Sequence, residues 1–480
     1  MHQVTPKAGK FKPWVSVLCA ASLAVVFAFL LWPTPAADEL SSLRYPGESA
    51  GRMMDRHLGF YEGIESVPTW QRVFFTFLFG SRSDIEDEAI GVFNEVLVHL
   101  QEHPEQSQPW VVFNTQSRLL VTLAESGRWD ALHRALGDFD QSPEQEATAE
   151  AIRYAYFTDH GRAPSPEVYS GAAQLPLGWA LDRLHWRIAD KANDPRSLRR
   201  VERRMLERAE ALRQRVLILS GVIASLIAAG VVLLVRLRPW RWHTPWGQGA
   251  LGQPWSGTDG LAVILRAAFL GILISLALAL YADQYFRPGI WALWSALFAS
   301  IPMMWLMYRH LLRPRGLTFR SAFGLSLRGV GVGRFAAITL SLLAVEWSGM
   351  LLIAWAGWHL GWETHWSQGL SERMVFGPWE TTVLGGINVV VWTAVFEEIG
   401  FRGLLYVTLR AWWRPLPAAL ACAGIFSALH LYSIVGFLSV FWTGLVLCYA
   451  FERFRSLLPG MIVHGASNML TLSTVLLFYR

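Results

Sequence analysis

The chain has 480 residues, of which 53% are hydrophobic and only 16% are charged, and its mean hydropathy is +0.30. A typical soluble domain carries about 25% charged residues, so the composition argues against a soluble enzyme, a disordered chain and a fibrous protein. The net charge is +5, but the arginines fall mainly beside apolar stretches, which is typical of a membrane protein and does not indicate a nucleic-acid partner. The cysteines (Cys19, Cys422 and Cys448) form neither a C-x-x-C site nor a disulfide framework.

Nine apolar stretches are candidate membrane spans, since a span needs about 20 apolar residues. They cover residues 14–32, 216–235, 261–281, 289–308, 335–357, 382–409, 416–432, 434–451 and 460–478. We interpret residues 1–37 as an uncleaved anchor, because the apolar run is longer than the usual signal-peptide core of about 7–15 residues. A cleaved signal peptide is the alternative, and the total would then be eight spans.

The basic residues predict the orientation of these spans. With a cytoplasmic N terminus, most loop arginines lie inside, whereas the short outside loops hold only Arg287 and Arg373, plus the last residue, Arg480. We therefore expect a multi-pass protein of a bacterial inner membrane, with residues 38–215 outside. The arginine-rich stretch 196–215 runs against this bias, but intervening glutamates partly neutralise it.

Residues 38–215 show helical spacing of apolar residues and little strand alternation. A helix is predicted over 84–101, and residues 118–139 predict a helical hairpin that faintly resembles one tetratricopeptide unit without a second copy. The region has no metal cluster and no nucleophile motif. We interpret it as an extracytoplasmic interaction or regulatory module that could bind a protein partner.

The sixth apolar stretch carries Glu397, Glu398 and Arg402 in its middle. Charges inside a bilayer cost at least a few kcal/mol each and mark function by default. Glu398 and Arg402 lie four residues apart on one helix face and can pair, whereas Glu397 lies about 100° round the helix. A buried structural ion pair would explain Glu398 and Arg402 but would leave Glu397 without a role.

Two later stretches also carry polar residues at membrane depth. Phe426 and His430 lie one turn apart in the seventh stretch, and His464 and Asn468 lie one turn apart in the ninth. A lone histidine is more often a satisfied core residue, but an inward-facing amide is a donor that could hold an oxyanion. Since each polar side chain costs insertion energy, their chance placement together is improbable.

These three motifs, in this order on successive helices, resemble the CAAX protease and bacteriocin-processing (CPBP, or Abi) family of intramembrane endopeptidases, which includes the CAAX prenyl protease 2 type. The resemblance covers about residues 380–478 of a predicted core at 380–480, and residues 216–357 would complete an all-α bundle. It implies hydrolysis of a peptide bond in a membrane-associated protein or peptide substrate.

The resemblance also implies a role for each motif residue. Glu397 would activate a water as general base, and His430 would help to hold that water. His464 and Asn468 would stabilise the tetrahedral oxyanion. Glu398 and Arg402 would orient the site, with Phe426 packed beneath it.

The resemblance leaves the use of a metal open. Glu397, His430 and His464 would form a zinc ligand set with an open position. We favour chemistry without a metal cofactor, because two adjacent carboxylates and an oxyanion amide can do the work unaided. The enzyme would thus be a glutamic protease or a metalloprotease.

The sequence lacks the motifs of other intramembrane protease classes. No H-E-x-x-H sequence is present, and Gly465-Ala-Ser467-Asn468 fails the Gly-x-Ser-Gly pattern at its last position. Glu346, in the fifth stretch, is a further carboxylate that we expect to pair inside the bundle. Two non-protease alternatives are an inactive scaffold or sensor that uses the outer domain, and a proton-coupled transporter, although no inverted repeat is visible.

One geometric difficulty follows from residue counting. His464 would lie near the cytoplasmic end of its span and His430 nearer the outer end. One site cannot hold both if the helices are straight and full length. A helix that starts inside the membrane at Pro459-Gly460 would reduce the gap.

Overall fold

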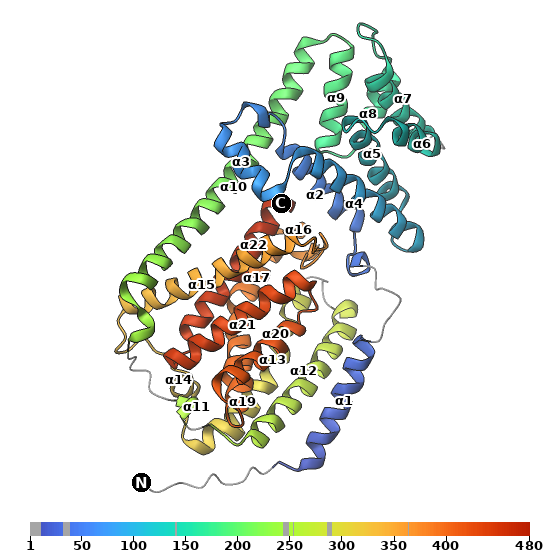
Figure 1. Ribbon diagram of the computed structural model, residues 1–480. Coiled ribbons are helices and arrows are strands. Elements are labelled where there is room, and N and C mark those ends of the chain that lie inside the picture. The colour runs from blue at the N-terminus through green and yellow to red at the C-terminus, as the bar shows by residue number, and fades with distance from the viewer. Residues whose placement is uncertain are drawn as a thin grey trace. The chain divides into compact units, whose positions relative to one another are not determined.

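The computed structural model describes residues 11–31, 39–139, 142–242, 249–252, 254–285, 290–362 and 364–480. Within these ranges every regular element is a helix and none is a strand, which confirms the predicted all-α fold (Figure 1). Residue contacts divide the chain into two compact units. One comprises Met1–Ala36 with Gly221–Ser473, and the other Ala37–Ser220 with Thr474–Arg480.

Six helices of the described chain are long and apolar enough to cross a membrane, so the protein is a multi-pass membrane protein. They are Pro195–Leu237, Gly257–Leu278, Val332–His359, Trp379–Arg410, Ile434–Phe454 and Leu458–Leu477. The other three predicted spans correspond to α1 (Pro13–Leu31), to α13 (Ile290–Leu306), which continues into a π segment at Met307–Leu312, and to α20 (Pro415–Ala428).

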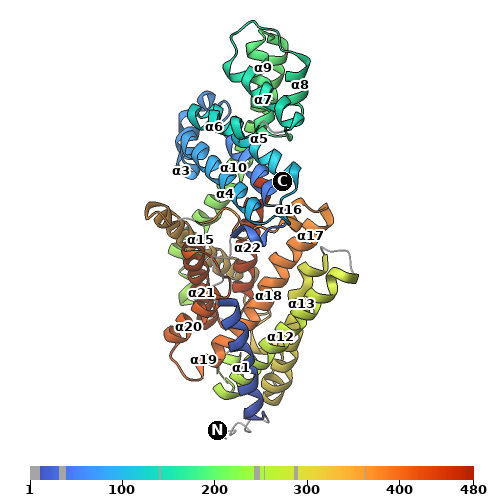
Figure 2. The same cartoon turned by 90° about the vertical axis from the view of Figure 1, so that its right-hand side faces the viewer.

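The membrane unit also contains α12 (Gly257–Tyr285), α15 (Val332–His359), α21 (Ile434–Phe454) and α22 (Leu458–Tyr479). Helices α1 and α13 both pack along α12 (Figure 2). Arg266 of α12 donates from Nη1 to the Ser16 hydroxyl on α1, 2.7 Å away. Short helices α11 (Gly249–Gly252), α14 (Phe319–Ala322) and α16 (Glu372–Phe376) lie in the connections.

The span Trp379–Arg410 is one continuous helical rod with two π-helical segments. Its parts are α17 (Trp379–Ile387), the π segment Asn388–Thr393, α18 (Ala394–Glu397), the π segment Glu398–Tyr406 and α19 (Val407–Arg410). A π turn is wider than an α turn, and such turns occur frequently at functional sites. The second segment carries part of the first polar motif.

Small residues let the helices of this unit approach closely. A Cβ on Gly444 of α21 would lie 2.8 Å from the Ala423 side chain of α20, and one on Gly465 of α22 would lie 2.7 Å from the Val390 carbonyl oxygen. Helices in lipid gain little from apolar burial, so close backbone packing is a main source of their association. These glycines therefore position α20, α21 and α22 around the rod.

The second unit is built from α2 to α9 and the first part of α10. The bounds are α2 (Pro46–Phe60), α3 (Thr69–Phe79), α4 (Arg82–Glu102), α5 (Pro109–Glu125), α6 (Trp129–Phe139), α7 (Pro143–Phe157), α8 (Pro166–Ala172), α9 (Trp179–Lys191) and α10 (Pro195–Leu237). The predicted start of α4 is a capping box, in which the Ser81 and Asp84 side chains bond each other's backbone amides. The predicted hairpin is α5 and α6, which are separated at Gly127 (φ +70°).

Helix α10 runs without interruption through 43 residues, from the arginine-rich stretch into the second apolar stretch. The position 215–216, at which the sequence suggests a boundary, therefore lies inside one helix.

Candidate active site

A fully buried ion pair lies at the centre of the membrane unit. Arg402 Nη1 donates to Glu398 Oε1 at 2.8 Å, and neither residue is exposed to solvent. The guanidinium carbon of Arg402 lies 4.3 Å from the ring centroid of Phe426, on α20. The structure thus forms the pair that the four-residue spacing predicts, and it places the pair against the aromatic residue of the second motif.

His464 of α22 contacts both glutamates. Its Nδ1 lies 3.1 Å from Glu398 Oε1, and its Nε2 lies 3.6 Å from Glu397 Oε2. The imidazole is 5% exposed, so these contacts are shielded from bulk water. Because Glu398 also accepts from Arg402, the same carboxylate oxygen holds the arginine and orients the histidine.

Glu397 is the least enclosed member of this cluster. Its side chain is 29% exposed, yet its Oε2 is buried and has no hydrogen-bond partner among the described residues. A carboxylate that is held only loosely by its surroundings can accept a proton from a water molecule. Glu397 therefore differs from Glu398, which contacts both Arg402 and His464.

Phe426 joins the two histidines of the motifs. Its ring centroid lies 4.8 Å from that of His430 and 5.9 Å from that of His464, edge to face in both cases. His430 follows the end of α20, and its Nδ1 lies 2.8 Å from the Phe426 carbonyl oxygen. The ring of Phe426 therefore contacts both imidazoles and links His430 to His464.

The length of α20 removes the difficulty with depth. The helix has 14 residues and is therefore about 21 Å long, shorter than the roughly 30 Å hydrocarbon core of a bilayer. His430 thus follows a short helix, whereas residue counting placed it near the far end of a full span. The assumption of straight, full-length helices was wrong for α20.

Asn468 lies one turn beyond His464, and its Nδ2 donates to the Val389 carbonyl oxygen at 2.8 Å. Val389 belongs to the first π segment, where Asn468 satisfies a backbone acceptor. An amide carries two N–H donors, so this bond leaves one for other use. Within the described chain, Asn468 is tied to the rod's backbone and not to the glutamates.

The proposed metal ligands do not assemble in the described chain. Among the described residues, no group of three or more His, Cys, Asp or Glu side chains is arranged to hold a metal ion. The set Glu397, His430 and His464 therefore does not fit a preformed metal centre in this conformation.

A second buried network supports the third motif. Glu346 of α15 accepts hydrogen bonds from Ser467 (2.7 Å to Oε2) and Thr443 (2.8 Å to Oε1), and Ser467 accepts one from Trp347 Nε1 at 2.9 Å. The expectation that Glu346 finds a polar partner in the bundle is confirmed. Sequence reasoning considered Ser467 only as a failed nucleophile. The sequence signal for its role in this network was its position, as a polar residue in an apolar helix one turn from His464.

The chain matches a known protein family over part of its length. Residues 379–470 match the family model described as type II CAAX prenyl endopeptidase Rce1-like. No curated protein and no solved structure matches the chain. The matched range holds all three motifs and leaves the second unit outside it. Residues 379–470 of this multi-pass membrane protein are thus similar to the Rce1-like type II CAAX prenyl endopeptidases.

Proposed function

We propose that the protein is an intramembrane endopeptidase that cleaves a membrane-associated protein or peptide with a glutamate-activated water. The observation that carries the proposal is the contact of His464 with both Glu397 and Glu398 beside the buried Arg402. The cluster combines a partly accessible carboxylate with a histidine whose orientation is fixed. The family match at residues 379–470 supports a protease, and the arrangement supports Glu397 as the base.

In the proposed reaction, Glu397 takes a proton from a water molecule, and the water oxygen attacks the carbonyl carbon of the peptide bond. Glu397 then returns the proton to the leaving amine nitrogen as the C–N bond breaks. Amide hydrolysis needs a base within reach of the water and donors aimed at the developing negative charge. The 3.6 Å contact between Glu397 and His464 is longer than a hydrogen bond, and such contacts often tighten when substrate binds.

The remaining motif residues position these groups. Glu398 accepts from Arg402 and holds Nδ1 of His464, so Nε2 is the nitrogen left to face the reacting atoms. His430 uses Nδ1 near its own helix end, which leaves its Nε2 to hold the water. The second N–H of Asn468 would donate to the oxyanion.

A metal-dependent route remains the alternative mechanism, with Glu397, His430 and His464 drawn together around the ion. The two mechanisms differ in their response to metal removal. We expect purified protein to keep its cleavage rate after chelation, with no stoichiometric zinc by elemental analysis. Loss of cleavage on chelation and its recovery with zinc would support the metalloprotease.

Replacement of Glu397 by Gln tests the proposed function. Gln keeps the shape of the side chain but cannot accept a proton, so cleavage by the reconstituted protein should fall by about 100-fold or more. Thermal stability in detergent should stay near the wild-type value. Glu380→Gln is the matched control, because Glu380 is an exposed residue in α17 of the same rod.

Comparison of membrane proteomes with wild-type protein and with Glu397→Gln should reveal the substrate as a protein that accumulates uncleaved. If Glu397→Gln cleaves at the wild-type rate, the proposed base is wrong. If Glu398→Gln is then stable and inactive, the two carboxylates have the opposite roles.

A further inference from the structure

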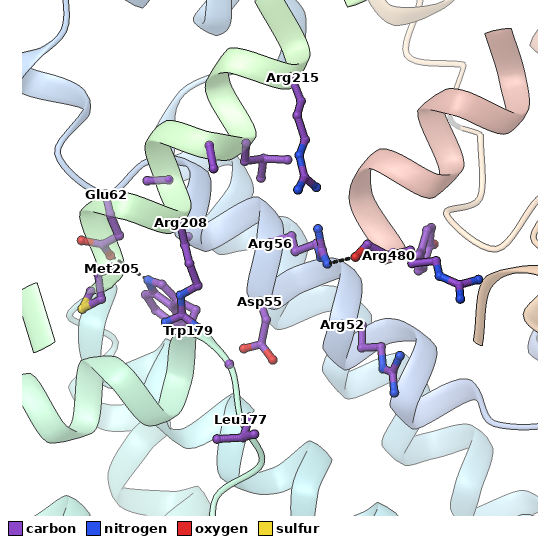
Figure 3. Close-up of a pocket in the computed structure, with 16 residues that line it drawn as sticks. Arg52, Asp55, Arg56, Glu62, Leu177, Trp179, Met205, Arg208, Arg215 and Arg480 are labelled. Atoms are coloured by element: carbon purple, nitrogen blue, oxygen red, sulfur yellow. Dashed lines mark hydrogen bonds between the residues drawn. The ribbon is translucent and has the colours of Figure 1, made fainter. Parts of the chain in front are cut away.

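A cavity of about 460 Å³ lies within the second unit, remote in sequence from the three motifs (Figure 3). Its walls come from α2, α9, α10 and the last residues of α22. The cavity is lined by five arginines (Arg52, Arg56, Arg208, Arg215 and Arg480) and two acidic residues (Asp55 and Glu62). Most of the other lining residues are apolar, and they include Trp179, Met205 and Leu212.

The two acidic residues are already engaged by groups outside the arginine set. Asp55 accepts from Arg118 Nε at 3.0 Å and from the Ala180 amide at 3.4 Å. Glu62 accepts from Trp179 Nε1 at 2.7 Å and pairs with Arg183 at 3.4 Å. These two carboxylates are therefore held mainly by cations outside the lining set, although Asp55 also offsets part of the charge of Arg208.

Two of the lining arginines pair with carboxylates beyond the cavity, Arg52 with Glu48 and Arg208 with Asp182. Arg56 instead donates to the carbonyl oxygen of Leu477 (3.2 Å) and to a backbone oxygen of Arg480 (2.6 Å).

Arg215 has neither an ion pair nor a hydrogen bond within the part of the chain that the structure describes. Figure 3 shows Arg56 and Arg215 directed into the same space from α2 and α10. Two cationic side chains thus share one cavity, and Arg215 has no carboxylate partner among the described residues.

The effect of this arrangement is visible in the pKa of Arg56. Burial lowers the pKa of its guanidinium below the usual value, and the positive charges of Arg215, Arg52 and Arg208 lower it further. Several positive charges gathered in one place destabilise the folded unit by mutual repulsion. A bound anion would remove this repulsion.

We propose that the cavity binds a phosphate group between Arg56 and Arg215, with the rest of the ligand against its apolar wall. The planar fork of a guanidinium matches the oxygens of a phosphate in bidentate geometry, and two such forks suit a group with more than one negative charge. The cavity volume is in the range of small-molecule sites, about 300–1,000 Å³.

The place of these residues along their helices bears on the source of the phosphate. Arg215 directly precedes the apolar stretch 216–235 of α10, and the apolar part of α22 ends at Leu477, close to Tyr479 and Arg480. Both elements therefore enter the cavity where a membrane-spanning helix ends. A lipid headgroup and a soluble phosphate compound offer the same group to the arginines, and the experiment separates them.

The test uses the full-length protein in nanodiscs, with Arg215→Gln as the variant. Arg215 is exposed and holds no partner in the described chain, so its replacement should leave folding intact. Inorganic phosphate and glycerol 3-phosphate are titrated in phosphatidylcholine discs, and phosphatidylglycerol retention is measured by mass spectrometry after purification from mixed discs. Arg203→Gln is the matched control, because Arg203 is an exposed arginine of α10 outside the cavity.

Arg215→Gln should weaken binding by about tenfold, the effect of one charge-assisted hydrogen bond, while Arg203→Gln leaves it unchanged. Binding of the soluble phosphates identifies a soluble ligand, and selective retention of phosphatidylglycerol identifies a headgroup. The proposal is overturned if Arg215→Gln and Arg203→Gln behave alike, or if neither the soluble phosphates nor phosphatidylglycerol binds. Peptide cleavage does not enter this test, so its outcome is independent of the proposed protease function.

Discussion

At the residue scale, the charged side chains of Glu398 and Arg402 are fully buried in the helix bundle. Each remains incompletely satisfied among the described residues, since Glu398 Oε2 and the Nε and Nη2 of Arg402 have no hydrogen-bond partner there. A buried pair with open hydrogen-bonding capacity is a costly way to gain stability. Its contact with His464 supplies a reason for its presence, because the pair fixes the imidazole beside Glu397.

Replacement of Glu398 by Gln should lower the free energy of unfolding by about 3–5 kcal/mol, because Arg402 is left charged and unpaired in a dry environment. The double change Glu398→Gln with Arg402→Met should recover part of this loss, since it removes both charges. Thermal unfolding in detergent measures the effect. A double variant less stable than both single variants would contradict this reading of the pair.

His57 of α2 provides a prediction for pH. The side chain is only partly buried as a whole, but its Nδ1 is shielded from solvent, and burial lowers the pKa of the imidazole to about 4. In the unfolded chain the ring binds a proton below about pH 6.5, whereas in the folded chain it does so only near pH 4. Stability is therefore present above pH 6.5 and is lost as the pH falls towards 4.

The loss should reach up to about 2 kcal/mol between pH 7 and pH 5. The variant His57→Gln should show a flatter dependence of thermal stability on pH over this range. His133→Gln, at an exposed position on α6, serves as the control and should keep the wild-type slope. Equal slopes for all three proteins would reject His57 as the titrating group.

At the scale of elements, the approach of α22 to the rod sets the geometry of the site. Gly465 follows His464 directly, and a Cβ there would lie 2.7 Å from the carbonyl oxygen of Val390 in the first π segment. The neighbouring atom belongs to the backbone, so the helices themselves would have to separate. The distance between His464 and Glu397 depends on the same contact.

Gly465→Ala should therefore cost about 1–3 kcal/mol of stability and reduce cleavage further than the stability loss alone explains. Gly221→Ala is the control, because nothing lies within 4 Å of a Cβ at that position of α10. Thermal unfolding and cleavage are measured on both variants. Wild-type behaviour of Gly465→Ala in both measurements would show that the packing of α22 can adjust.

At the scale of the whole molecule, the distribution of arginines predicts that residues 38–215 lie outside the membrane opposite a cytoplasmic N terminus. A periplasm-active reporter fused after residue 150 should be active, and a cytoplasm-active reporter at the same place should not. Fusions in the arginine-rich loop near residue 315 should give the opposite pattern. Cytoplasmic activity at residue 150 would reverse the orientation.

The sequence alone was sufficient for the long apolar helices and for the pairs within one helix. Apolar length predicts where α15, α21 and α22 cross, and four-residue spacing predicts the contact of Glu398 with Arg402, because both depend on local helix geometry. The family match at residues 379–470 confirms the resemblance that the three motifs indicated.

Contacts between helices required the tertiary structure. The short α20, the position of His464 against both glutamates, the bond of Asn468 to Val389 and the network around Glu346 all depend on helix length and on close packing at glycines. Spacing along one helix does not specify these, because side chains from separate helices meet only when the backbones pack in a particular register. The cavity between Arg56 and Arg215 has the same origin, since it joins residues more than 150 positions apart.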